Sequence, residues 1–144
     1  MNLTGKWKGT YTLGRGYPAE VVGKTDPFDI EIIDNDGNLT GICIDYITKD
    51  IPNNESTIEG VFKENYISFI KKYRYYSVFD DSGKEETAND DIKVDGIHYT
   101  GRLYKGFFSR RVYIKGEWTI TSEIKNDGKM FWNTVEGTWS MERI

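Results

Sequence analysis

The sequence VEGTW, residues 135–139 near the C-terminus, contains the pattern that most clearly indicates the fold. Val135, Gly137 and Trp139 occupy alternate positions, so on a β-strand all three face the same side. Glycine is nevertheless a poor strand residue, because it loses the most backbone freedom on folding and has no side chain to pack. A glycine on the apolar face therefore predicts a position where neighbouring atoms leave no room for a side chain.

The same five-residue pattern occurs six times along the chain. It appears as LTGKW (3–7), LTGIC (39–43), IEGVF (58–62), YTGRL (99–103), IKGEW (114–118) and VEGTW. Two further strands without the glycine are predicted at 28–32 (FDIEI) and 66–76 (YISFIKKYRYY). No segment shows helical periodicity over more than one or two turns, so the predicted class is all-β with eight strands.

Turn sequences connect these strands in chain order. DNDGN (34–38), KEN (63–65) and KNDGK (125–129) are typical of tight hairpins, which predicts an antiparallel meander. Longer connections are expected at 14–27, 50–55 and 80–91, and we interpret the acidic 80–91 segment as a solvated loop.

An open eight-stranded sheet would leave its apolar face and its edges exposed, whereas closure buries the face and removes the edges. Closure also explains the glycines, since a small barrel cannot hold a large side chain at every inward position. We therefore predict one domain over residues 1–144, an eight-stranded antiparallel up-and-down β-barrel.

Gly5 and Trp7 form a Gly-x-Trp motif on the first predicted strand. This motif on an eight-stranded meander resembles the calycin superfamily, which includes lipocalins, avidins and fatty-acid-binding proteins. In lipocalins that Trp closes one end of the barrel and packs against an Arg at the end of the last strand. The resemblance implies that Trp7 and Arg143 stack, a cation–π contact of about 0.5–2 kcal/mol.

Departures from individual calycin families limit what the resemblance implies. Avidins carry polar biotin ligands where this chain has Gly9 and Leu13, and a Tyr where it has Cys43, so biotin binding is not supported. The 14–27 connection is too short for the two helices of fatty-acid-binding proteins. The opening also resembles the haem-binding nitrobindins, but their C-terminal histidine has no counterpart here, and His98 is the only histidine.

Extending the alternation along each strand predicts which side chains face inward. This set is Trp7, Tyr11, Phe28, Ile30, Ile32, Leu39, Ile58, Phe62, Tyr99, Leu103, Ile114, Trp118, Ile120, Trp139 and Met141. An eight-stranded barrel is just wide enough to be filled or to hold one small ligand. Both a filled core and a ligand cavity therefore remain open at this point.

Our leading hypothesis is a non-enzymatic protein that binds a small, mainly apolar ligand in an aromatic-lined cavity open at one end. The residues predicted to contact the ligand are Tyr11, Phe28, Phe69, Lys71, Tyr73, Tyr99, Trp118 and Trp139. We expect Tyr17, Pro18 and the 80–91 loop at the rim. The alternative is a structural or interaction module with a filled core that acts as a homodimer.

Two charged residues fall in the inward series, Asp45 and Lys71. A buried charge is costly unless it is paired. In one interpretation Lys71, with Tyr99 or Arg102 at the rim, meets an anionic head group of the ligand. In the other, which we favour, Asp45 and Lys71 form an internal ion pair or Lys71 reaches out of the open end.

Several apolar side chains face outward on neighbouring strands: Ile42, Ile44, Tyr46, Val61 and Ile70. An apolar patch on an outer surface is typical of a partner contact. We expect a homodimer through this face, against the alternative that a loop covers it.

Composition narrows the other possibilities. With 19 Lys and Arg against 23 Asp and Glu, the net charge of −4 argues against nucleic acid as a partner. No apolar run approaches the roughly 20 residues that cross a bilayer, so membrane insertion is not expected. The single Cys43 and the absence of a signal-like start favour the cytoplasm. Since no metal-binding, phosphate-binding or nucleophile motif is present, we expect no metal, cofactor or catalytic residue.

Overall fold

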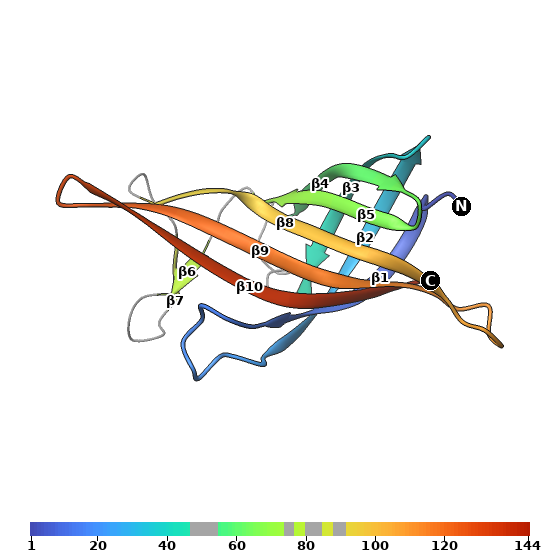
Figure 1. Cartoon of the computed structure of the whole chain (residues 1–144), viewed down its shortest axis with the longest axis horizontal. Helices are drawn as coiled ribbons and strands as arrows, with labels where there is room; N and C mark the ends of the chain where they lie inside the picture. The colour runs from blue at the N-terminus through green and yellow to red at the C-terminus, as the bar shows by residue number, and fades with distance from the viewer. Residues whose placement is uncertain (47–54, 74–76, 80–84, 88–91) are drawn as a thin grey trace.

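In a computed structural model of the chain, eight antiparallel strands form a closed barrel (Figure 1). The structure describes residues 1–46, 55–73, 77–79, 85–87 and 92–144. The barrel strands are β1 (Gly5–Leu13), β2 (Thr25–Asn35), β3 (Asn38–Asp45), β4 (Ser56–Lys63), β5 (Tyr66–Lys72), β8 (Ile92–Lys105), β9 (Val112–Asn126) and β10 (Lys129–Arg143). Each pairs with its neighbour in the chain, and β1 closes the barrel against β10. The predicted all-β meander barrel is confirmed.

Three two-residue turns set the register of the hairpins that were predicted from turn sequences. Asp36 and Gly37 have φ of 53° and 88°, Glu64 and Asn65 have 54° and 66°, and Asp127 and Gly128 have 51° and 72°. Positive φ at both central residues is the requirement of the type I′ turn, whose twist matches that of paired strands. The strands on either side of each turn therefore continue directly into one ladder.

Two details of the predicted strand pattern were wrong. β5 ends at Lys72 and does not include Tyr73, because the ladder with β8 stops at the Lys71–Ile97 pair, beside a bulge between Val94 and Ile97. The last part of the predicted strand, 74–76, lies outside the described residues. The chain also contains a small two-stranded sheet of β6 (Ser77–Phe79) and β7 (Glu85–Thr87). β7 lies within the segment predicted as a solvated loop, and the rest of that segment, 80–84 and 88–91, lies outside the described residues.

The barrel core follows the predicted alternation. Of the fifteen residues predicted to face inward, twelve are buried, and Tyr11, Phe62 and Ile120 are half-buried against the core. Leu3, Trp7, Ile32, Ile67 and Ile114 are fully excluded from solvent. Closure of the sheet thus removes a continuous apolar face from water, the main favourable contribution to folding.

The repeated glycines lie where strands approach too closely for side chains. A Cβ at Gly137 would meet the Thr12 carbonyl and the Trp118 ring, and one at Gly60 would lie 2.5 Å from the Cα of Phe69. At Gly116 the obstacle is again backbone, the carbonyl of Thr100. Gly5 differs, since no atom lies within 4 Å of its Cβ position and its φ is +139°. The glycine in VEGTW is therefore explained by close contact inside the barrel.

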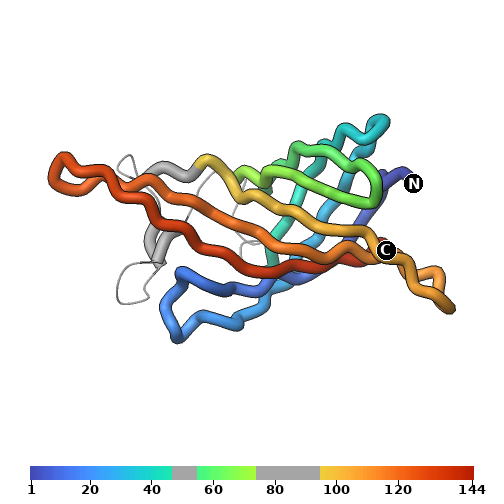
Figure 2. Tube along the Cα trace, in the orientation of Figure 1, coloured from blue at the N-terminus to red at the C-terminus, as the bar shows by residue number. Residues whose placement is uncertain are grey.

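One hairpin extends well beyond the barrel. The far halves of β9 and β10 run together to the turn at Asp127 and Gly128 and form a long arm (Figure 2). At the opposite end of the molecule, the β8–β9 connection projects as a shorter hairpin tip. One end of the barrel thus carries the long β9–β10 arm, and the other carries the shorter β8–β9 hairpin.

Candidate functional site at the open end of the barrel

One end of the barrel is closed by Trp7. Its side chain is fully buried, and its indole N–H donates to the carbonyl of Leu3 at 2.9 Å. The guanidinium of Arg143 lies 4.8 Å from the Trp7 ring centroid, and its Nη2 donates to the Asn2 carbonyl. This confirms the stacking that the calycin resemblance implies, and it leaves the other end, where β1 runs into residues 14–24, as the candidate site.

An ion pair lies inside the barrel toward that open end. Lys71 Nζ donates to both carboxylate oxygens of Asp45, at 2.9 and 3.2 Å, and the two side chains are 3% and 2% exposed. The internal pair that we favoured from the sequence is confirmed. Because the two charges cancel, the pair presents no net charge to a molecule entering the barrel.

Aromatic rings surround the ammonium group of Lys71. Its Nζ lies 4.8 Å from the ring centroid of Tyr73, 5.6 Å from those of Tyr11 and Tyr99, and 5.8 Å from that of Phe28. Cations are attracted to the electron-rich faces of such rings, and more strongly when water is excluded. The cage therefore helps to hold a charged lysine inside the barrel.

The surroundings of Lys71 determine its charge state. Burial disfavours the ammonium, but the Asp45 carboxylate favours it through its charge and its hydrogen bonds, and the pKa of Lys71 is raised above its ordinary value. Burial raises the pKa of Tyr99 to about 12 and that of Cys43 to about 11. At neutral pH the phenol and the thiol are thus protonated and the lysine is charged, so Lys71 is not available as a nucleophile.

A second group of rings lies on β5, β8, β9 and β10. Phe69 stacks on Tyr99 with centroids 4.8 Å apart and 6° between planes, and Trp139 packs edge-on against both. Tyr17, from the β1–β2 connection, packs edge-on against Trp118 at 6.0 Å. Offset and edge-on geometries are those that aromatic pairs prefer. The described rings thus form two packed groups inside the barrel, one of Phe69, Tyr99 and Trp139 and the other of Tyr17 and Trp118.

The indole N–H groups of this surface are already satisfied. Trp118 donates to the Thr138 carbonyl at 3.1 Å, and Trp139 donates to the carbonyls of Thr100 and Glu117. These bonds cross between strands, so the two tryptophans brace the wall. Their indole N–H groups are therefore already used within the barrel wall.

All eight residues predicted to contact a ligand lie in this one region. Phe28, Phe69, Lys71, Tyr99, Trp118 and Trp139 are buried, and Tyr11 and Tyr73 are half-buried. Tyr17, predicted at the rim, is half-buried and packs on the core, as does Val21, which the sequence reasoning missed. Nothing in the local pattern of the β1–β2 connection indicated that Val21 would turn back onto the barrel.

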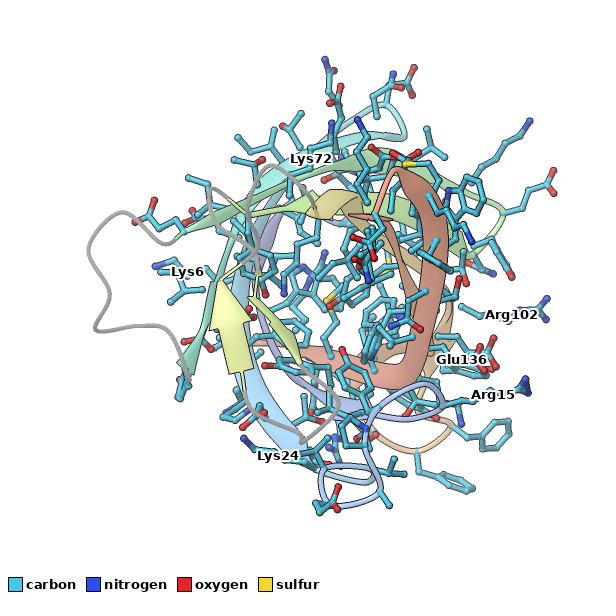
Figure 3. All side chains as sticks on the ribbon, turned by 90° about the vertical axis from the view of Figure 1, so that its left-hand side faces the viewer. Lys6, Arg15, Lys24, Lys72, Arg102 and Glu136 are labelled. Carbon is cyan, nitrogen blue, oxygen red and sulfur yellow. The ribbon has the colours of Figure 1, made fainter. Side chains whose placement is uncertain are left out.

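Arg102 does not belong to this region. The sequence hypothesis placed it at the rim, but it is exposed on the outer wall, where its guanidinium lies 5.8 Å from the Tyr66 ring centroid (Figure 3). Its position in β8 alternates with the inward Tyr99 and Leu103, so the strand directs it outward. His98 is likewise exposed, as expected.

A cleft of about 690 Å³ lies outside the barrel, which sequence reasoning did not indicate. It is lined mainly by outward side chains of β1, β2 and β10 and by the β8–β9 hairpin, among them Lys8, Asp29, Tyr46, Arg111 and Glu142. Arg111 is paired with Glu142 at 2.6 and 2.8 Å, and the Tyr46 hydroxyl donates to Asp29 at 2.9 Å. Strands distant in the sequence meet here, so no local motif could have predicted the cleft.

The predicted dimer face is exposed but not continuous. Ile42, Ile44 and Val61 are 48%, 39% and 52% exposed, and Ile70 is half-buried. However, Ile42 on β3 pairs with Thr57 on β4, and Ile70 on β5 pairs with Glu59 on β4. Polar side chains of β4 therefore separate the apolar ones. The alternation along each strand predicted correctly that these apolar side chains face outward. The register between strands, however, places polar side chains between them, so they form no continuous apolar surface.

Among the residues that the structure describes, no group of three or more His, Cys, Asp or Glu side chains is placed to hold a metal ion. Within the same residues, no helix is long and apolar enough to span a membrane.

Comparison with solved structures identifies the fold. The chain is similar to rhizavidin, with a TM-score of 0.50, 12% sequence identity, and coverage of 95% of this chain and 81% of that one. It also aligns with the short afifavidin–biotin complex, with a TM-score of 0.43, 10% identity, and coverage of 93% and 87%. No protein-family model and no curated protein matches the chain. The structure is a calycin-like barrel, and the likeness is one of fold alone.

Proposed function

We propose that the open end of the barrel binds a small, neutral, mainly apolar ligand. The observation that carries this proposal is the group of three half-buried tyrosines, of which Tyr11 and Tyr73 lie against the buried Lys71–Asp45 pair and Tyr17 packs on Trp118. Ligand pockets are mostly aromatic and apolar with a few fixed polar groups, and in barrels they lie at the mouth. Partly exposed rings beside a satisfied polar pair fit that description.

The ion pair supports a neutral ligand over an anionic one. An anion at Lys71 would have to displace the Asp45 carboxylate, which already receives two contacts from the ammonium, and would leave that carboxylate buried without its partner. A neutral ligand requires no such exchange and gains contact with Tyr11, Tyr73 and Trp118. Selectivity then comes from ring geometry more than from charge.

Biotin is not our candidate. Gly9 and Leu13 occupy the β1 positions at which avidins carry polar ligands, and a Cβ at Gly9 would meet the Ser140 carbonyl and the Phe28 ring. The backbone of β10 therefore occupies the space that a polar side chain at residue 9 would need.

Native mass spectrometry of the protein purified from its source tests the proposal. We expect a bound small molecule that is retained by Thr10→Ala, an exposed position on the outer side of β1, and is lost or weakened about tenfold in Tyr11→Ala. Protein that carries no ligand from its source, and whose Trp fluorescence does not respond to a panel of neutral aromatic compounds, would contradict it.

As a second candidate we propose a homodimer through the face that contains Ile42, Ile44 and Val61. Their exposure supports it, although the polar Thr57 and Glu59 between the apolar side chains make a weak association the expectation. Light scattering across a concentration series tests it, with Ile42→Ser/Ile44→Ser expected to shift the equilibrium to monomer. A protein that stays monomeric at the highest concentration would exclude it.

A further inference from the structure

The hairpin between β8 and β9 carries two aromatic side chains that no part of the described chain covers. Phe107 and Phe108 are 92% and 98% exposed, and they contact each other edge-on with ring centroids 4.8 Å apart. Both belong to the connection between β8 and β9, which projects at the closed end of the barrel (Figures 1 and 2). Two adjacent phenylalanines held fully in water are costly unless a partner buries them.

The base of this hairpin is joined to β10 by a surface ion pair. Gly106 N–H donates to the Arg111 carbonyl at 2.9 Å, and the Arg111 guanidinium makes two bonds to the Glu142 carboxylate on β10. The hairpin is thereby fastened to the barrel wall on the far side of the two phenylalanines. The rings point into solvent from an anchored support.

Charge on this hairpin is of one sign. Between residues 102 and 115 the sequence RLYKGFFSRRVYIK contains five basic and no acidic residues, while the whole chain has 19 basic and 23 acidic residues. All five basic side chains are exposed, and Arg102 and Lys115 lie over the rings of Tyr66 and Tyr104 on the outer wall. Because Arg111 is paired with Glu142, the basic charge next to the apolar tip comes from Lys105 and Arg110, in contrast to the acidic surface expected from the net charge.

From these observations we propose that the β8–β9 hairpin tip docks the protein on an anionic phospholipid surface. Phe107 and Phe108 would enter the boundary between head groups and acyl chains, where apolar area contributes to binding. Lys105 and Arg110, on either side of the pair, would lie among the anionic head groups, which attract basic side chains within about a Debye length. Apolar insertion and charge attraction thus act at the same place.

Docking through this tip would orient the barrel. The tip lies at the end closed by Trp7, whereas Tyr11, Tyr17 and Tyr73 lie at the opposite end. A membrane-bound molecule would therefore keep its open end toward the aqueous phase. The inference does not depend on the proposed ligand, since the two sites share no residue.

Co-sedimentation with vesicles tests the proposal. We expect the protein to bind vesicles of phosphatidylcholine with phosphatidylserine and not vesicles of phosphatidylcholine alone, with binding reduced by salt. Phe107→Ser/Phe108→Ser should lower the partition coefficient about tenfold or more, because buried apolar area sets interfacial affinity. Lys105→Gln/Arg110→Gln should weaken binding and flatten its salt dependence.

The chain provides a matched control in its other exposed aromatic pair. Phe131 and Trp132, on the β9–β10 arm, are 50% and 67% exposed, but the segment 123–132 that contains them carries two acidic and two basic residues. Phe131→Ser/Trp132→Ser should leave vesicle binding unchanged. Circular dichroism of all variants checks that the barrel is intact.

Four outcomes would overturn the proposal: no binding to anionic vesicles, equal binding to neutral and anionic vesicles, binding that survives Phe107→Ser/Phe108→Ser, or self-association through the tip without vesicle binding. The last would assign the phenylalanine pair to a contact between copies of the chain.

Discussion

At the closed end of the barrel, Trp7 donates to the carbonyl of Leu3 and Arg143 covers the ring and bonds to Asn2, while the Nε of Arg143 is buried without a hydrogen-bond partner among the described residues. At the open end, rings of similar size are left half-buried, and the charged pair of Lys71 and Asp45 lies among them. The same alternating strands build both ends. The two ends differ in burial, since the Trp7 side chain is fully buried, whereas Tyr11, Tyr17 and Tyr73 remain partly exposed to solvent.

Removal of the plug should have the largest effect. Trp7→Ala is expected to lower the free energy of unfolding by about 3–5 kcal/mol, because it leaves a large cavity at a fully buried site and removes the support of Arg143. Urea denaturation measures the change. If the two ends are independent, the variant should still take up ligand at the open end, and loss of uptake in folded protein would contradict that independence.

Disruption of the ion pair tests the open end directly. Lys71→Met should cost about 3 kcal/mol, because the Asp45 carboxylate is then buried without its partner. Lys71→Met/Asp45→Leu should recover most of that loss, since an apolar pair of similar volume removes both charges. The exposed neighbour Lys72→Met serves as the control and should change stability by less than about 0.5 kcal/mol.

The same variants separate the two interpretations of Lys71. Ligand uptake that survives in Lys71→Met/Asp45→Leu would show that no head group of the ligand needs the ammonium. Uptake lost in the folded double variant, with stability retained, would instead favour an anionic ligand over the neutral one that we propose.

Gly137→Ala probes the wall between the two ends. Its Cβ would meet the Thr12 carbonyl and the Trp118 ring, so β10 must move, and we expect a loss of about 1–3 kcal/mol in the free energy of unfolding. Thr138→Ala, at the exposed position next to it, should change stability by less than about 0.5 kcal/mol. Equal effects of the two substitutions would show that the glycine is not required by space.

The smallest expected effect is the fall in the free energy of unfolding when the pH is raised just above 9. The pKa of Cys43 is raised from 9.0 to about 11, and that of Tyr99 from 10.0 to about 12. Above pH 9 the unfolded chain therefore loses protons that the folded chain keeps, and stability should fall as pH rises, by at most about 1.4 kcal/mol per pH unit for each group. Cys43→Ala should move the onset from about pH 9 to about pH 10, and an unchanged onset would contradict the assignment to the thiol.

Much of the fold was predictable because its causes are local. The six glycine-centred segments, the turns at Asp36–Gly37 and Asp127–Gly128, and the alternation that places Trp118 and Trp139 inward each depend on backbone geometry over a few residues. The strand end at Lys72 and the β6–β7 sheet were missed, since both depend on where a neighbouring ladder stops.

For the candidate site the division is similar. Alternation along each strand was enough to predict that Asp45 and Lys71 face inward together with aromatic side chains. It also predicted that Arg143 continues the inward-facing series of the last strand and could therefore meet Trp7. Other features became known only from the three-dimensional structure. Lys71 lies 2.9 Å from Asp45, and Tyr17 packs on Trp118. Polar residues divide the outer apolar face, and Phe107 and Phe108 are exposed in the β8–β9 connection. Parity is a property of each strand, whereas these distances follow from the register between strands and the closure of the barrel, which no single strand specifies.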